Sequence, residues 1–65
     1  MHLVVNGELR NLSNASTLTE LLNALALTGR LAIEVNGEIV PRSHYSEYRL
    51  NDRDAIEIVR AIGGG

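Results

Sequence analysis

One amphipathic helix is the feature that most constrains how this chain folds. Four leucines occur at positions i, i+3, i+4 and i+7, which places them on one face of a helix: Leu18, Leu21, Leu22 and Leu25. Thr17 and Glu20 have the spacing of a capping box at the start of a helix. Gly29 stands where a left-handed C-terminal cap is expected. We predict one helix over residues 17–27, and its single apolar face requires one apolar face of a sheet to cover it.

Short segments on both sides of this helix alternate apolar and polar residues, the pattern of half-buried strands. The predicted strands span residues 1–5, 8–12, 31–35, 38–40 and 55–60. Asn6-Gly7 and Asn36-Gly37 predict tight hairpin turns, because both residue types tolerate a positive φ. Pro41 ends the fourth strand, since proline cannot donate to a central ladder. The residues predicted to face the helix are Leu3, Val5, Ile33, Val35, Ile56 and Ile58.

The segment before the last strand carries shorter signals. Residues 43–48 predict a helical turn with Ser43 as its N-cap. Leu50 is expected to anchor the following loop to the core. Residues 51–54 then predict a turn before the last strand. The order is therefore β-β-α-β-β-β. We expect the first and last strands to lie side by side and parallel at the centre of the sheet, with the helix in their connection. The prediction is an α+β fold: a mixed sheet of four to five strands packed on one main helix.

Composition excludes several classes of protein. The 65-residue chain has no cysteine, so side-chain thiolate chemistry and disulfides are absent. With a net charge of −2 and no basic run, nucleic-acid binding is not expected. His2 and His44 lack the spacing of a helical metal pair, and we predict no metal site and no catalytic residue. The N-terminal residues resemble neither a signal peptide nor a membrane span, which favours a cytoplasmic protein.

The sequence ends in Gly63-Gly64-Gly65. Glycine has no Cβ, so a glycine segment threads a channel too narrow for other residues. A terminal carboxylate on such a segment is a group that an adenylating enzyme can grip. We therefore divide the chain into a folded domain over residues 1–62 and a flexible tail over residues 63–65, with Gly65 expected at the carboxyl terminus.

The whole chain resembles a known family. The segment Val35-Asn36-Gly37-Glu38-Ile39-Val40-Pro41-Arg42 and the terminal glycines are similar to the ThiS family, the sulfur carrier proteins of thiamin thiazole biosynthesis, which have the ubiquitin-like β-grasp fold. Two features depart from the family's pattern. Gly63 adds a third glycine, and the family's Gly-Asp turn before the last strand reads Arg53-Asp54 here.

The resemblance implies a function for the tail. A ThiF-like adenylating enzyme uses ATP to activate Gly65, a sulfur donor such as a cysteine desulfurase converts the adenylate to a thiocarboxylate, and a ThiG-like thiazole synthase receives the sulfur. The chain is then a recycled co-substrate with no permanently bound cofactor, and it is not an enzyme.

The folded body must dock on these partners. The partner-facing positions predicted on the sheet face away from the helix are Val4, Ala32, Glu34, Glu57, Val59 and Ala61, and Arg60 is added because it lies near the tail. The sequence leaves two roles open for Arg42, which either fixes a loop or contacts a partner. Two alternatives also stay open: a sulfur carrier for another acceptor, of the molybdopterin synthase small-subunit type or a protein conjugate, and a β-grasp interaction module whose tail is idle.

Overall fold

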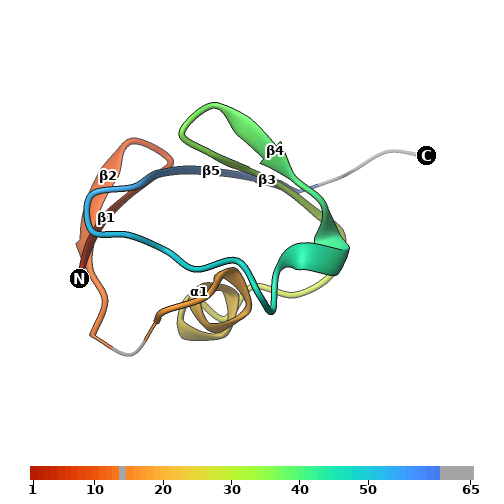
Figure 1. Ribbon diagram of the computed structural model, residues 1–65, viewed down its shortest axis with the longest axis horizontal. Coiled ribbons are helices and arrows are strands. Elements are labelled where there is room, and N and C mark those ends of the chain that lie inside the picture. Colours follow the sequence, from red (N-terminus) through yellow and green to blue (C-terminus); the bar gives the residue numbers. More distant parts are fainter. Residues whose placement is uncertain (14, 61–65) are drawn as a thin grey trace.

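A computed structural model describes residues 1–13 and 15–60 of the chain. Its elements are β1 (His2–Val5), β2 (Glu8–Asn11), α1 (Leu18–Ala24), β3 (Leu31–Val35), β4 (Glu38–Val40), the 3₁₀ helix η1 (Arg42–His44) and β5 (Ala55–Arg60). The five strands form one sheet in the order β2-β1-β5-β3-β4, and α1 lies across one face of it (Figure 1). The predicted order of elements is confirmed, and each strand lies within one residue of its predicted bounds.

The first and last strands are neighbours at the centre of the sheet. β1 pairs with β5 in parallel, with Val5 opposite Ile56, whereas β3 pairs with β5 antiparallel, with Ile33 opposite Ile58. The two hairpins β1–β2 and β3–β4 lie on either side of β5. This mixed arrangement confirms the predicted parallel contact between the N-terminal and C-terminal strands.

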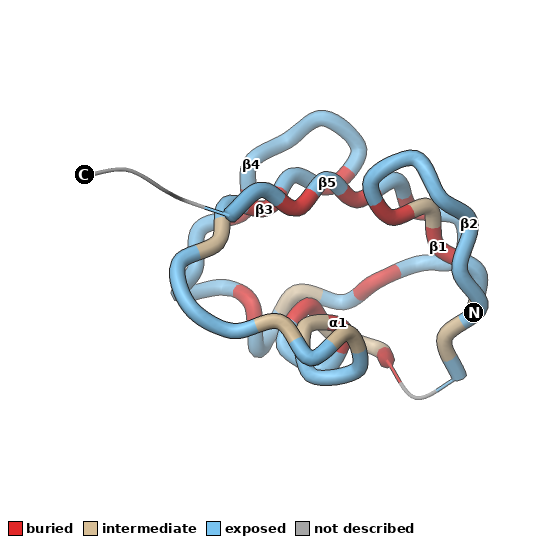
Figure 2. Tube along the Cα trace, turned by 180° about the vertical axis from the view of Figure 1, so that it is seen from behind, coloured by how far each residue is buried: buried red, intermediate tan, exposed pale blue. Residues whose placement is uncertain are grey.

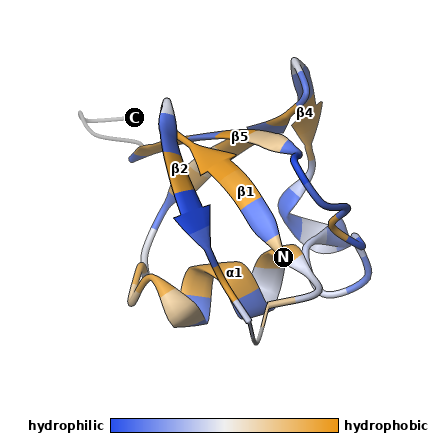
Figure 3. Cartoon of the chain, turned by 90° about the vertical axis from the view of Figure 1, so that its left-hand side faces the viewer, coloured by the Kyte–Doolittle hydropathy of each residue, from blue (hydrophilic) through white to orange (hydrophobic). Residues whose placement is uncertain are grey.

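The core lies between the sheet and the helix. Figure 2 shows the buried segments of the strands facing those of α1, and Figure 3, seen from the β2 edge, shows apolar residues on both layers. All six residues predicted to face the helix are buried: Leu3, Val5, Ile33, Val35, Ile56 and Ile58. On α1, Leu18 and Leu21 are fully buried, while Leu22 and the C-cap residue Leu25 are partly buried at the margin of the core. Leu50 is buried as predicted, so the loop before β5 is anchored to the same core.

The helix begins where the sequence predicts and ends earlier. Thr17 is the N-cap, and the complete capping box with Glu20 is present. The helix stops at Ala24 because Ala26 adopts a left-handed conformation with φ 56°. The Ala26 N–H donates to the Asn23 carbonyl at 3.1 Å and the Leu27 N–H donates to the Leu22 carbonyl at 2.9 Å, the bonding pattern of a Schellman cap.

The prediction that Gly29 caps this helix is therefore wrong. Gly29 also has a positive φ of 93°, but it lies in the loop between α1 and β3. Alanine rarely adopts the left-handed conformation because its Cβ approaches the following carbonyl oxygen. The sequence signal for the cap consequently pointed to the glycine rather than to Ala26.

The short helical turn after β4 also begins earlier than predicted, with its N-cap two residues before the predicted one. Pro41 is the N-cap of η1, no side chain caps it, and Ser43 lies inside the helix. The fixed φ of proline, here −62°, suits the entry to a helical turn, and proline has no N–H that would need a partner. Ser43 as N-cap is thus corrected to Pro41.

Both Asn-Gly pairs form the predicted turns. Asn6 and Asn36 have φ values of 50° and 52°, and the glycines that follow them have φ values of 82° and 87°. Positive φ at both central residues defines the type I′ turn, whose twist matches that of the flanking strands. The turn before β5 is confirmed as well, with Arg53 in a left-handed conformation at φ 72°.

Candidate functional site

The candidate site is the end of β5, the central strand. The Ile56 and Ile58 side chains are buried in the core, while Arg60, the last residue of the strand, is exposed. The predicted tail residues Gly63, Gly64 and Gly65, the boundary after residue 62 and the predicted surface residue Ala61 lie outside the described residues. The structure therefore describes the strand that precedes the glycine segment, as far as Arg60.

Arg60 ties this strand end to the loop after the helix. Arg60 lies opposite Leu31 in the antiparallel ladder, and its Nη1 atom donates a hydrogen bond to the Thr28 carbonyl at 3.2 Å. The same guanidinium atom lies 3.6 Å from where a Cβ on Gly29 would be. The Arg60 side chain thus attaches the end of β5 to the loop after α1. This role was not predicted from the sequence.

An asparagine side chain extends the ladder along the other edge of β5. Asn6 leaves β1 at its turn, yet its Oδ1 accepts from the Ile58 N–H at 2.7 Å and its Nδ2 donates to the Ile58 carbonyl at 3.2 Å. The carboxamide replaces a backbone peptide group and keeps β5 paired where β1 has ended. The only sequence signal for this role was the presence of asparagine in the turn.

Asn36 makes a similar set of bonds at the start of β5. Its Oδ1 accepts from the Ala55 N–H at 2.9 Å, and its Nδ2 donates to the buried Asp54 carboxylate at 2.9 Å. Asp54 also accepts from the Asn51 N–H at 2.8 Å, which closes the turn before the strand. Side chains of the two hairpin turns therefore hold β5 at its start, through Asn36, and at Ile58, through Asn6.

The structure brings most of the predicted partner-facing residues together on the outer face of the sheet. Glu34 lies directly opposite Glu57, and Ala32 lies opposite Val59, which is 60% exposed. Val4 is separated from this group: it is partly buried and lies opposite Ala55 on the β1 side of β5. The four residues Ala32, Glu34, Glu57 and Val59 form a patch that we call the outer patch.

Two exposed apolar residues on this face were missed from the sequence. Ile39 on β4 is 76% exposed and lies opposite Glu34, and Leu9 on β2 is 71% exposed and lies opposite Val4. The alternation along each strand carried the signal, because a residue opposite an outward-facing one also faces outward. Ile39 extends the outer patch toward the β4 edge.

The outer patch carries uncompensated negative charge. Glu34 and Glu57 are cross-strand neighbours, and neither forms an ion pair with any residue in ranges 1–13 and 15–60. Like charges placed directly opposite each other destabilise a sheet by a few tenths of a kcal/mol to about 1 kcal/mol. A partner that supplies positive charge here removes that repulsion.

Two carboxyl groups have lowered pKa values, and both lie away from the end of β5. Hydrogen bonds from the Ser16 hydroxyl and the Ser16 and Thr17 backbones lower the pKa of Glu20 in the capping box. A hydrogen bond from the His2 backbone lowers the pKa of Asp52, with smaller contributions from the charges of His2 and Arg53. Within the described part of the chain, no cluster of three or more His, Cys, Asp or Glu residues has the geometry of a metal site.

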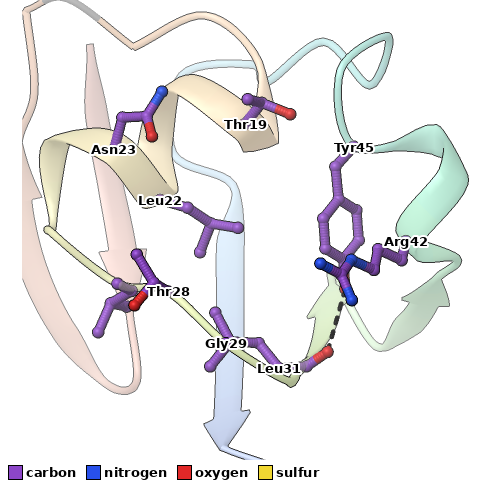
Figure 4. A pocket seen from close by; sticks show the side chains of 9 residues that line it. Thr19, Leu22, Asn23, Thr28, Gly29, Leu31, Arg42 and Tyr45 are labelled. Atoms are coloured by element: carbon purple, nitrogen blue, oxygen red, sulfur yellow. Dashed lines mark hydrogen bonds between the residues drawn. The ribbon is translucent and has the colours of Figure 1, made fainter.

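A pocket of about 250 Å³ opens beside the end of β5 (Figure 4). It lies between α1, the following loop, the start of β3 and η1. Its apolar wall contains Leu22, Leu31 and Tyr45, and the Tyr45 hydroxyl donates to the Leu31 carbonyl at 3.4 Å. The Arg42 side chain extends from η1 toward the pocket. The structure therefore places this arginine in the pocket lining, and does not show it fixing a loop.

These features define a class of protein: a small β-grasp domain, in which one helix crosses a mixed sheet whose central strand is the last strand of the chain. No helix among the described residues is long and apolar enough to span a membrane.

Comparison with known proteins identifies the family. A model of the ThiS family matches residues 3–65. The sulfur carrier protein ThiS of Bacillus subtilis is 42% identical over 53 residues, with 80% of each chain covered. The crystal structure of the thiamine biosynthesis protein ThiS from Geobacter metallireducens has a TM-score of 0.86 and 35% identity, with both chains fully covered. The chain belongs to the ThiS family, the sulfur carriers of thiamine biosynthesis.

A thiazole synthase of Paramagnetospirillum magneticum is also similar, at 50% identity over 66 residues. That match covers all of this chain and 20% of the thiazole synthase. The chain thus spans one fifth of the length of this relative.

Proposed function

We propose that Gly65 is the residue on which this chain carries sulfur. The observation that supports the proposal best is the extent of the family match, which runs to residue 65 and so includes all three terminal glycines. The structure adds that the last strand before them is the central strand of the sheet, held by Asn36 at Ala55 and by Asn6 at Ile58. A firmly held strand gives an enzyme a fixed body from which to draw the tail.

The chemistry requires two displacements at the terminal carboxyl group. A carboxyl terminus has a reference pKa of about 3.5, so it is ionised at neutral pH. One carboxylate oxygen attacks the α-phosphorus of ATP and pyrophosphate leaves, which gives an acyl adenylate. A hydrosulfide equivalent from the sulfur donor then attacks the acyl carbon, and AMP leaves with the bonding electron pair. The product is a thiocarboxylate on Gly65, whose sulfur is the nucleophile in the next reaction.

On this proposal the chain is a co-substrate and not an enzyme. The adenylating enzyme binds the ATP, and the carrier holds no permanent cofactor. Residues 1–62 form the domain that partners recognise, and residues 63–65 form the tail that enters their active sites. Because ATP and the biosynthetic partners are cytoplasmic, we place the carrier in the cytoplasm.

The partners follow from the same chemistry. A ThiF-like enzyme activates Gly65, a donor such as a cysteine desulfurase supplies the sulfur, and thiazole synthase consumes it. The Paramagnetospirillum relative supports the last step, because a segment similar to this whole chain occupies one fifth of a protein named thiazole synthase. Two functions joined in one polypeptide are commonly used together.

The outer patch is the surface that we propose for docking. It combines exposed apolar side chains with Glu34 and Glu57, which form no ion pair with other described residues, so it fits a partner surface with apolar groups and basic side chains. We propose that Val4 and Ala61 also contact partners, outside this patch, and that Arg60 holds the last residue of β5 in place for docking.

Deletion of Gly64 and Gly65 tests the function. Full-length and truncated chains are incubated with the adenylating enzyme, and ATP–pyrophosphate exchange is measured. We expect exchange with the full-length chain and none with the truncated one, while both chains unfold at the same urea concentration. Exchange by the truncated chain would show that activation does not require Gly65, and no exchange with either chain would favour an interaction module with an idle tail.

A further inference from the structure

The pocket beside the end of β5 takes no part in the chemistry proposed for Gly65. It is built from three segments distant in sequence: helix α1 with its following loop, the start of β3, and η1. Pro41 places η1 against this hollow by ending β4 and beginning the helical turn. The Pro41-Arg42 pair, singled out in the sequence, therefore has the structural effect of placing a guanidinium at the pocket (Figure 4).

Arg42 is available for a ligand. Its side chain makes no hydrogen bond or ion pair with any of residues 1–13 and 15–60. Arg60, nearby, differs in this respect, since it is bound to the Thr28 carbonyl. A guanidinium has five N–H donors in a planar fork, a geometry that matches the two oxygens of a carboxylate.

The lining of the pocket selects an anionic group on an apolar stem. Leu22, Leu31 and Tyr45 provide the apolar wall, Asn23 and Thr28 are neutral polar neighbours, and the lining contains no acidic residue. At about 250 Å³ the pocket is smaller than the roughly 300–1,000 Å³ typical of small-molecule sites. A single side chain is therefore a better fit than a cofactor.

The position of the pocket indicates where that side chain comes from. Leu31 lies in the pocket wall and is paired with Arg60, the last described residue before the tail. An enzyme that draws Gly65 into its active site must approach this end of the domain.

We propose that the Arg42 pocket receives a Glu or Asp side chain of the enzyme that adenylates Gly65. The carboxylate pairs with the Arg42 guanidinium in a two-point contact, and its stem lies against Leu31 and Tyr45. Such a contact fixes the orientation of the carrier at the base of its tail. This inference rests on the proposed function of Gly65, and it adds a second contact site distinct from the outer patch.

Charge reversal with a matched control tests this pocket. The variant is Arg42→Glu, and the control is Arg53→Glu, which makes the same change in charge at the opposite end of β5. ATP–pyrophosphate exchange is measured with the adenylating enzyme at increasing carrier concentration and at two salt concentrations. We expect the KM for Arg42→Glu to rise roughly tenfold or more with kcat unchanged, and the KM for Arg53→Glu to stay within about twofold of the wild type.

A second variant and a folding control keep the result interpretable. Arg42→Gln removes the charge with a smaller change in shape, and it should raise the KM less than Arg42→Glu and weaken its salt dependence. Urea unfolding of each variant shows that the domain is intact. Equal KM values for Arg42→Glu and Arg53→Glu would overturn the pocket proposal while leaving the role of Gly65 standing. No exchange with the wild-type chain would instead contradict the proposed function.

Other occupants give different results, and each would overturn the proposal. A KM effect confined to sulfur transfer to thiazole synthase would assign the pocket to that enzyme. A change in the sedimentation of the isolated chain with Arg42→Glu would assign it to a second copy. A shift of the Arg42 Nε–Hε NMR signal on deletion of Gly64 and Gly65 would assign it to the chain's own tail.

Discussion

The Asn6 carboxamide pairs with both backbone groups of Ile58, accepting from its N–H at 2.7 Å and donating to its carbonyl at 3.2 Å. Strand β1 ends at Val5, which lies opposite Ile56. The backbone of β1 therefore leaves the second half of β5 without a partner on this side. The side chain fills that place. A turn residue thereby stabilises the strand from which the tail departs.

Replacing Asn6 by glycine should destabilise the domain by about 1–2 kcal/mol. Glycine keeps the positive φ of the turn, so the loss comes mainly from the two hydrogen bonds to Ile58, each worth roughly 0.5–1.5 kcal/mol. The free energy of unfolding in urea measures the effect. Hydrogen exchange at the Ile58 amide should accelerate in the variant, and an unchanged exchange rate would show that the carboxamide does not hold this strand.

Replacing Arg53 by glycine should stabilise the domain by about 0.5–1 kcal/mol. Arg53 has a φ of 72°, where a side chain is strained and glycine is not. Its ion pair with Asp52, at 3.7 Å between largely exposed groups, contributes little. Arg53→Ala is the control, because it removes the charge and keeps the strain. The account requires glycine to be more stable than alanine at this position, and the reverse order would contradict it.

The two central leucines of α1 should differ in their contribution to stability. Leu21 is fully buried, so Leu21→Ala should cost about 2–5 kcal/mol. Leu22 is partly buried and lines the open pocket, so its replacement by alanine should cost clearly less, about half as much. Urea unfolding of the two variants gives the comparison directly. Equal losses would mean that α1 is rotated relative to the sheet.

The capping box should make stability depend on pH. The pKa of Glu20 is lowered from its ordinary value of 4.5 in the folded state, chiefly by the Ser16 hydroxyl. Because the folded pKa lies below the unfolded one, the carboxylate stabilises the domain above the unfolded value, and this stabilisation is lost as the pH falls through the folded pKa. Wild type should therefore exceed Glu20→Gln in stability at pH 7, and the gap should close in acid. A gap independent of pH would assign the effect to something other than ionisation.

Most of the fold was predictable because its signals are local. The leucine stripe and the pairing of Thr17 with Glu20 predicted where α1 begins, and the two Asn-Gly turns with their alternating strands predicted both hairpins. The end of α1 was not predictable from composition, because Ala26 takes a conformation that alanine seldom adopts.

The features around the site that were missed depend on contacts between distant residues. The bond from Asn6 to Ile58 joins residues 52 positions apart, and the Arg60 bond to Thr28 joins residues 32 positions apart. The Arg42 pocket needs three segments to assemble before it exists. The outer patch was predicted in part, since period-two alternation identified Glu34, Glu57 and Val59 but not Ile39, which lies opposite Glu34.

The most direct test of the account is the intact mass of the chain after incubation with ATP, its adenylating enzyme and a sulfur source. We predict an increase equal to the replacement of one oxygen by sulfur, and fragmentation should locate it on Gly65. Oxidation of Met1 gives nearly the same increase, so the fragment that contains Met1 must be shown to be unmodified. A mass that stays unchanged under these conditions, with the adenylating enzyme shown to be active, would contradict the assignment of Gly65 as the sulfur-carrying residue.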